Sequence, residues 1–103
     1  MATISKEELL RDVAWRSGIS KNNTEFVIDA LIDSIAESLS NGDRVMIRGF
    51  GTFEPKYRAA RSGRAADDGS KIFIPPQVKP VFKPGKTLVL KVQGYDIEPF
   101  DDD

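Results

Sequence analysis

The chain has 103 residues, of which 40% are hydrophobic and 30% are charged, so a single folded domain is predicted rather than a disordered chain. It contains no apolar run near the ~20 residues that a membrane crossing needs. The absence of cysteine and histidine excludes disulfides, thiolate chemistry, imidazole general bases and the commonest metal ligand. We therefore expect a protein that is not an enzyme and that holds no cofactor and no metal.

The net charge of −1 conceals three blocks of opposite sign. Residues 1–43 carry 4 Lys/Arg and 8 Asp/Glu, and residues 44–91 carry 11 Lys/Arg and 3 Asp/Glu. The last block, residues 92–103, carries no basic residue and 5 acidic ones. A basic middle between acidic ends indicates a polyanion-binding region followed by an acidic tail.

Helix signals occupy the first 42 residues. Ser5 and Glu8 form a capping box, and Gly18 suits a left-handed stop, so a first helix is predicted between them. A second, longer helix is predicted to end at Asn41-Gly42. Its start signal is one of Ser20, Asn22 and Asn23. Its broad apolar face consists of Val27, Ile28, Leu31, Ile32, Ile35 and Leu39.

The hydrophobic period becomes two after the second helix. Val45 and Ile47 predict a half-buried strand, and another strand is predicted from Thr52, after a glycine-rich turn at 49–51. Residues 54–71 are then charged and poor in bulky apolar side chains. A segment that leaves the core in this way cannot bury itself, so we expect it to protrude.

A returning strand is indicated by Ile72, Ile74, Val78 and Phe82. It is interrupted by Pro75, Pro76 and Pro80. Prolines cannot donate to a strand ladder, so these positions belong on edges or bulges of a protruding hairpin. Beyond Pro84-Gly85, residues 86–92 fit either a short helix or a strand.

The expected core is marginal for a chain of this length. The apolar face of the second helix and the three phenylalanines Phe50, Phe53 and Phe82 exceed what one short sheet would cover. Burial between two copies is the simplest remedy. We therefore interpret the phenylalanines as core and dimer contact.

The protruding hairpin is rich in basic side chains. These are Lys56, Arg58, Arg61, Arg64 and Lys71. The three arginines recur at every third residue, a spacing that on a twisting ribbon could follow a curved phosphate chain or a groove. The alternative is a solvated ribbon whose arginines keep an exposed edge soluble.

Three motifs together resemble those of the bacterial histone-like HU and integration host factor proteins. They are Gly49-Phe50-Gly51-Thr52-Phe53, Arg58-Ala59-Ala60-Arg61-Ser62-Gly63-Arg64 and Phe82-Lys83-Pro84-Gly85-Lys86. The resemblance runs from about residue 4 to 92. It implies an α+β fold in which two chains intertwine into a helical body with a small antiparallel β-saddle, and two β-ribbon arms embrace the minor groove and bend the duplex.

The resemblance also implies that residues 86–92 are helical and that body lysines contact the phosphate backbone. The candidate DNA contacts are Lys6, Arg48, Lys56, Arg58, Arg61, Arg64, Ala66, Lys71, Lys79, Lys83 and Lys86. The implied organisation is a DNA-binding domain over residues 1–93, with the arm at about 54–75, and an acidic tail over 94–103. The implied partners are double-stranded DNA and a second copy of the chain, with a paralogue as the alternative to the second copy. The implied location is the nucleoid in the bacterial cytoplasm, with a phage-encoded origin as the alternative.

Two features depart from the family pattern. Ala66 stands where the family's arm tip usually has a proline wedge, and Asp67 and Asp68 follow it. A methyl group buries little against a base, so we expect weaker or absent kinking or a tip that docks differently, unless the tip is simply a soluble turn. The acidic tail either competes with DNA for the basic saddle or is a disordered, solubilising end.

Other functions fit the sequence less well. An HU-like module for protein interaction, with DNA affinity reduced by the acidic tip and tail, is the main alternative. Single-strand or RNA binding would need exposed aromatic side chains, and only Tyr57 and Phe73 lie near the arm. A P-loop is excluded because Pro80 occupies the position of its first glycine.

Overall fold

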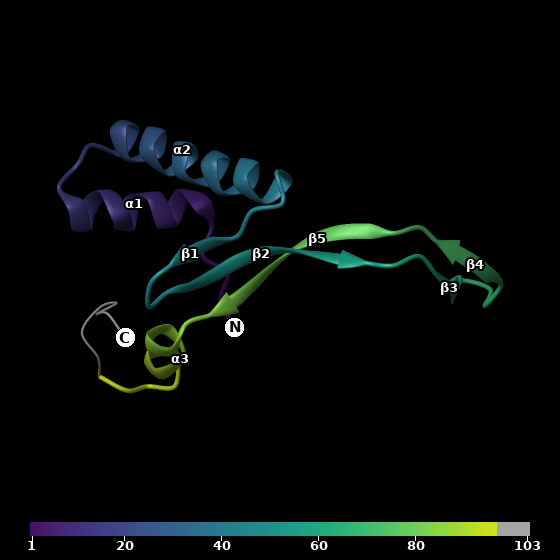
Figure 1. Ribbon diagram of the computed structural model, residues 1–103. Coiled ribbons are helices and arrows are strands. Elements are labelled where there is room, and N and C mark those ends of the chain that lie inside the picture. Colours follow the sequence, from purple (N-terminus) through teal and green to yellow (C-terminus); the bar gives the residue numbers. More distant parts are fainter. Residues whose placement is uncertain (97–103) are drawn as a thin grey trace. The chain divides into compact units, whose positions relative to one another are not determined.

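The computed structural model describes residues 1–96 and divides the chain into two compact units, Met1–Glu37 and the part from Ser38 onward (Figure 1). The first unit contains helix α1 (Lys6–Ser17) and most of helix α2 (Lys21–Ser40). No helix within residues 1–96 is long and apolar enough to cross a membrane.

The caps of α1 confirm the sequence signals. The Ser5 hydroxyl accepts a hydrogen bond from the backbone N–H of Glu8 and donates one to that residue's carboxylate, both at 3.2 Å. Gly18 ends the helix at φ 74°, a left-handed conformation in which its N–H reaches the carbonyl of Ala14. These two caps fix the ends of α1 as predicted.

Helix α2 begins at the first of the three predicted signals. The Ser20 hydroxyl accepts a hydrogen bond from the N–H of Asn23 at 3.2 Å, and the helix ends before Gly42, which has φ 87°. Lys21 forms an ion pair with Glu7, which links the two helices. Among the described residues only one hydrophobic side chain, Leu10, is fully buried.

The second unit is built on a three-stranded antiparallel sheet. Its strand order is β1 (Val45–Ile47), β2 (Gly51–Arg58) and β5 (Gln77–Pro84), so β5 lies at an edge. Pro80 lies inside β5, opposite Pro55 of β2. The predicted edge position of Pro80 is therefore confirmed, although the strand continues through it, because an edge strand tolerates a proline whose missing N–H would face away from its partner.

The chain breaks out of this sheet at two facing points, residues 59–60 and 75–76. Beyond them strands β3 (Arg61–Arg64) and β4 (Lys71–Ile74) form a separate two-stranded ladder that extends the ribbon away from the sheet (Figure 1). The protruding hairpin predicted from the hydrophilic segment is thus present. We use "arm" for residues 54–80.

Residues 86–92 form a helix, α3 (Lys86–Val92), so the local strand reading is wrong and the implied helix is confirmed. Tertiary contacts decide it, because the N–H of Gly85 donates to Phe50 O at 2.8 Å and the N–H of Leu88 donates to Gly49 O at 3.2 Å. A Cβ at Gly85 would lie 2.7 Å from Gly49 O, so only glycine permits this approach.

The three phenylalanines cluster where β2, β5 and the glycine turn meet. The Phe82 ring centroid lies 4.7 Å from that of Phe53 and 5.3 Å from that of Phe50, both in tilted geometry. Phe82 remains 37% exposed. The cluster is thus a small core of the second unit, and its predicted dimer contact stays a prediction.

Candidate nucleic-acid interface

The arm has a proximal part, formed by β2 and β5, and a distal part, formed by β3 and β4. The register of β2 with β5 gives the proximal arm two different faces. Residues paired in an antiparallel ladder share a face, and faces alternate along each strand. One face, called here the basic face, carries Lys56, Arg58, Gln77 and Lys79. The other carries Pro55, Tyr57, Val78 and Pro80. Charge and apolar surface are therefore segregated across the ribbon.

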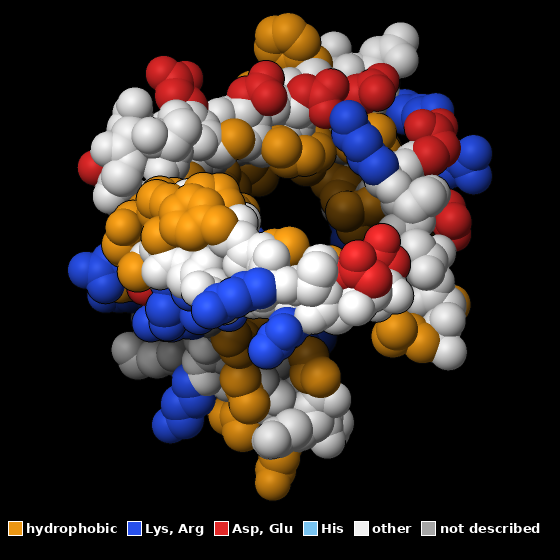
Figure 2. Space-filling model, turned by 90° about the vertical axis from the view of Figure 1, so that its right-hand side faces the viewer, with side chains coloured by type: hydrophobic (Ala, Val, Ile, Leu, Met, Phe, Trp, Pro, Cys, Tyr) orange, Lys and Arg blue, Asp and Glu red, His pale blue; other side chains and the backbone are white. Residues whose placement is uncertain are grey.

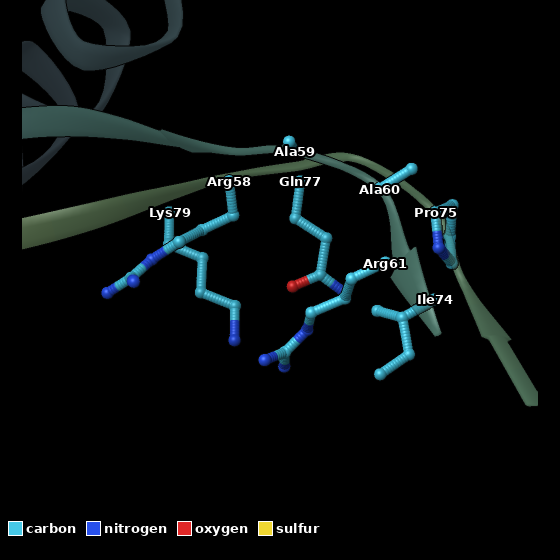
Figure 3. Close-up of a pocket in the computed structure, with 8 residues that line it drawn as sticks. All are labelled: Arg58, Ala59, Ala60, Arg61, Ile74, Pro75, Gln77 and Lys79. Carbon is cyan, nitrogen blue, oxygen red and sulfur yellow. The ribbon is translucent and has the colours of Figure 1, made fainter. Parts of the chain in front are cut away.

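Arg61 of the distal arm joins the basic face. Figure 3 shows the side chains of Arg58, Arg61, Gln77 and Lys79 projecting from the same side of the ribbon. Together with neighbouring residues they line a hollow of about 560 Å³. Arg58 and Arg61 are an odd number of residues apart and would point to opposite faces of a regular strand, but the break at 59–60 restores them to one face.

The basic face is not neutralised by acidic side chains. Among the described residues, no carboxylate forms an ion pair with Lys56, Arg58, Arg61 or Lys79. Unpaired cations that converge on an open hollow attract a polyanion, and arginine presents a planar fork that fits phosphate oxygens. The arrangement is therefore suited to a phosphate chain.

Two other candidate cations are already paired. Lys6 Nζ lies 2.7 Å from Asp29 Oδ1, and this hydrogen bond with Asp29 is the main reason why the pKa of Lys6 lies above its usual value. Lys83 Nζ lies 3.3 Å from Glu54 Oε2. A phosphate would have to compete with these carboxylates.

The remaining candidates lie outside the basic face. Arg64 and Lys71 pair across the distal ladder on the face opposite Arg61. Arg48 lies in the turn after β1, and Lys86 is the first residue of α3. Ala66 lies in the turn at the arm tip. The sequence motif alone does not reveal this division of the cations between two faces.

The tip turn is held by its own hydrogen bonds. Arg64 Nη1 donates to Gly69 O at 3.3 Å, Asp67 Oδ1 accepts from the N–H of Asp68, and Asp68 Oδ1 accepts from the N–H of Ser70, each of these two at 2.9 Å. The bond from Ser70 is the main reason why the pKa of Asp68 lies below its usual value. Both carboxylates are therefore structural parts of the turn.

Comparison with known proteins identifies the family of this chain over almost its whole length. The model of the family described as bacterial DNA-binding protein matches residues 4–93. The chain belongs to this family.

Named relatives include the DNA-binding protein HU of Geobacillus stearothermophilus, 47% identical over 82% of this chain and 94% of the relative. The DNA-binding protein HU 2 of Bacillus phage SPbeta is 44% identical over 82% of this chain and 92% of the relative. Among solved structures, an Anabaena HU–DNA cocrystal structure matches with a TM-score of 0.82 and 36% identity, covering 88% of this chain and 99% of that one. The α+β fold, the HU-like character and the non-catalytic class predicted from the sequence are thereby confirmed.

In this HU-family chain, the sequence did not identify one residue of the basic face as a candidate DNA contact. Gln77 lies opposite Arg58 in the ladder, and its side chain points with the arginines into the hollow (Figure 3). Its amide both donates and accepts hydrogen bonds, which suits base edges in a groove. No charge or motif marks it in the sequence, and only the register of β2 with β5 could have revealed it.

Among residues 1–96, no group of three or more side chains is arranged to hold a metal ion. The acidic-tail prediction concerns residues 94–103, of which 97–103 lie outside the described residues.

Proposed function

We propose that this protein is a non-catalytic architectural DNA-binding protein that stabilises bent duplex DNA with little sequence specificity. The observation that carries the proposal is the basic face of the arm, whose four cations have no acidic partner in the described part of the chain. Phosphate neutralisation releases counterions and supplies affinity without reading the sequence.

The DNA contacts are proposed residue by residue. Arg58 and Arg61 enter the minor groove, with Lys56 and Lys79 on the adjacent phosphates, because these side chains share one face. Lys6 and Lys83 exchange their carboxylate partners for phosphates on binding. The other proposed contacts, from the tip and the body, are Arg48, Arg64, Ala66, Lys71 and Lys86.

A homodimer is part of the proposal. Much of the apolar surface of α2 is exposed, with Phe26 at 77%, Val27 at 59% and Ile32 at 50%. A second copy of the chain would cover this apolar surface, and Phe50, Phe53 and Phe82 lie in the cluster proposed to extend into that contact.

The domain and the location are proposed accordingly. Residues 1–93 form the DNA-binding domain, and residues 94–103 form an acidic tail. The protruding part, predicted from the sequence at about 54–75, is taken as the arm over residues 54–80, since residues 77–80 pair with residues 55–58. A DNA-binding protein of this family acts at the bacterial nucleoid in the cytoplasm, with a phage-encoded origin as the alternative.

The experiment is a titration of duplex DNA by fluorescence anisotropy at ~50 and ~200 mM salt. If the protein makes six or more phosphate contacts, its affinity for DNA should fall by roughly three orders of magnitude or more between the two salt concentrations. An absence of binding at ~50 mM salt would refute the proposal. The acidic residues Asp67 and Asp68 at the tip would then favour a protein-interaction module with the same fold.

A further inference from the structure

Phe73 is an exposed aromatic residue that the basic face does not explain. It lies in β4 and is 71% exposed, more than any other large hydrophobic residue of the arm. Its ring contacts no other aromatic ring among the described residues. An aromatic side chain in water at the end of a ribbon gains nothing for folding, so a role in contact with a ligand is indicated.

The two faces of the distal arm differ in how their apolar side chains are covered. Ile72 and Ile74 share a face with Gly63, where a Cβ would lie 2.7 Å from Ile74 Cδ1. Ile74 thus packs closely over the glycine backbone, and Ile72 beside it is 41% exposed, well below the 71% of Phe73. On the opposite face, Phe73 has only Ser62 opposite it and remains open.

The open ring lies next to a pair of cations. Faces alternate along each strand, so Phe73 shares its face with Arg64 and Lys71, which pair at the next position of that face towards the tip. Figure 2, which is turned so that the right-hand side of Figure 1 faces the viewer, shows hydrophobic side chains next to Lys and Arg side chains. An aromatic ring beside two cations is complementary to a nucleotide, because the ring can stack on the base and the cations can bind the phosphates beside it.

We propose that Phe73 stacks on or inserts between base pairs of the bound duplex while Arg64 and Lys71 contact the flanking phosphates. The inference rests on the proposed function and adds to it a residue that deforms the DNA. Apolar wedges of minor-groove proteins include phenylalanine, and a phenyl ring has far more area to place against a base than the methyl group of Ala66. The chain therefore has a wedge on the side of the arm rather than at its tip.

The charge beside the ring favours DNA over another occupant. A second copy of the chain would bring an identical pair of cations near the first if the two rings met, and like charges would repel. A duplex brings phosphates instead. Contact between two copies is therefore an outcome that the experiment must detect separately.

The test compares Phe73→Ala and Phe73→Leu with the unmodified full chain. Val78→Ala is the matched control, because Val78 is an apolar arm residue of similar exposure (65%) that lies outside the distal arm. Short duplexes that each carry one 2-aminopurine at a different step report unstacking by increased emission. Energy transfer between the DNA ends reports bending, and anisotropy at fixed salt reports affinity.

The unmodified chain and the Val78→Ala variant should increase 2-aminopurine emission and bring the DNA ends closer together. Phe73→Ala should lose both effects and bind about tenfold more weakly, within the range for loss of one stacking contact. Its salt dependence should remain unchanged, because no cation is removed. Phe73→Leu should retain part of the emission change, since leucine also serves as a wedge.

Two results would overturn the inference while leaving the proposed function intact. One is a Phe73→Ala variant that binds, bends and unstacks DNA like the unmodified chain. The other is a change in the sedimentation of the DNA-free protein on Phe73→Ala, which would assign the ring to contact between copies. Absence of DNA binding by the unmodified chain would instead refute the proposed function itself.

Discussion

Removing one arginine from the basic face should change how strongly salt weakens DNA binding. Arg58 is the most informative residue to replace, because its side chain lines the hollow on the basic face and has no acidic partner in the described part of the chain. It is also exposed on a two-stranded ribbon, so Arg58→Ala should leave the fold intact.

The magnitude follows from counting the unpaired cations. If Lys56, Arg58, Arg61 and Lys79 each neutralise one phosphate, the two arms of a dimer make about eight contacts on the basic face, which contribute about −7 to the slope of log K against log salt. The other proposed contacts add to this slope. Arg58→Ala removes two contacts, so the slope should become less steep by about 2 and the loss of affinity between 50 and 200 mM salt should shrink about tenfold.

Anisotropy titrations of one duplex at four salt concentrations measure the slope directly. Arg16→Ala is the matched control, because Arg16 Nε is paired with Asp12 Oδ2 at 2.8 Å on α1 and is proposed to contact no phosphate. The control should keep the slope of the unmodified chain. A slope unchanged by Arg58→Ala, or changed equally by Arg16→Ala, would refute the assignment of the basic face to phosphates.

Four further predictions concern the tip, the tail and the helical unit. Replacing Asp67 and Asp68 by asparagine keeps the Oδ1 acceptors of the turn but removes two negative charges, so DNA binding in the anisotropy assay should tighten; weaker binding would show that the carboxylates themselves are needed. Ala66→Pro should bring the DNA ends closer together, as measured by energy transfer between them. Truncation after Gly94 should tighten DNA binding if the tail competes with DNA, whereas removal of a solubilising tail would leave the affinity unchanged. The hydrogen bond from Lys21 is the main reason why the pKa of Glu7 lies below its usual value. The stabilisation by this pair is therefore present above the ordinary glutamate pKa and is lost as the pH falls through the lowered one. The unfolding temperature of Glu7→Gln should accordingly lie below that of the unmodified chain at pH 7, and the two temperatures should converge in acid.

The parts of the fold that local chemistry determines were predictable from the sequence. Ser5, Gly18 and Gly42 mark helix ends because a cap depends on a few neighbouring residues. The helix α3 was not predictable locally, because its valines and leucines also suit a strand and its first turn is fixed by hydrogen bonds to Gly49 and Phe50. A distant part of the chain determines the conformation there, and only the family resemblance indicated it.

The same distinction applies to the candidate site. Clustering of basic residues is visible in the sequence, but a face is a property of register, and register depends on pairing between residues about twenty positions apart. The break at 59–60 brings Arg58 and Arg61 to one face, while the regular ladder beyond it sends Arg64 to the other. An arginine every third residue therefore does not make one continuous track.

The division of the cations has a mechanical consequence for an arm that binds DNA. A ribbon with cations on one face alone could lie along a groove with its other face in water, and the duplex would need no local distortion. Arg64 and Lys71 place charge on the second face as well, next to the open ring of Phe73. Phosphates can reach both faces only where the groove closes around the distal ribbon or where the duplex bends over it. The arrangement of charge thus favours bending at the same part of the arm where the aromatic ring could stabilise an unstacked step.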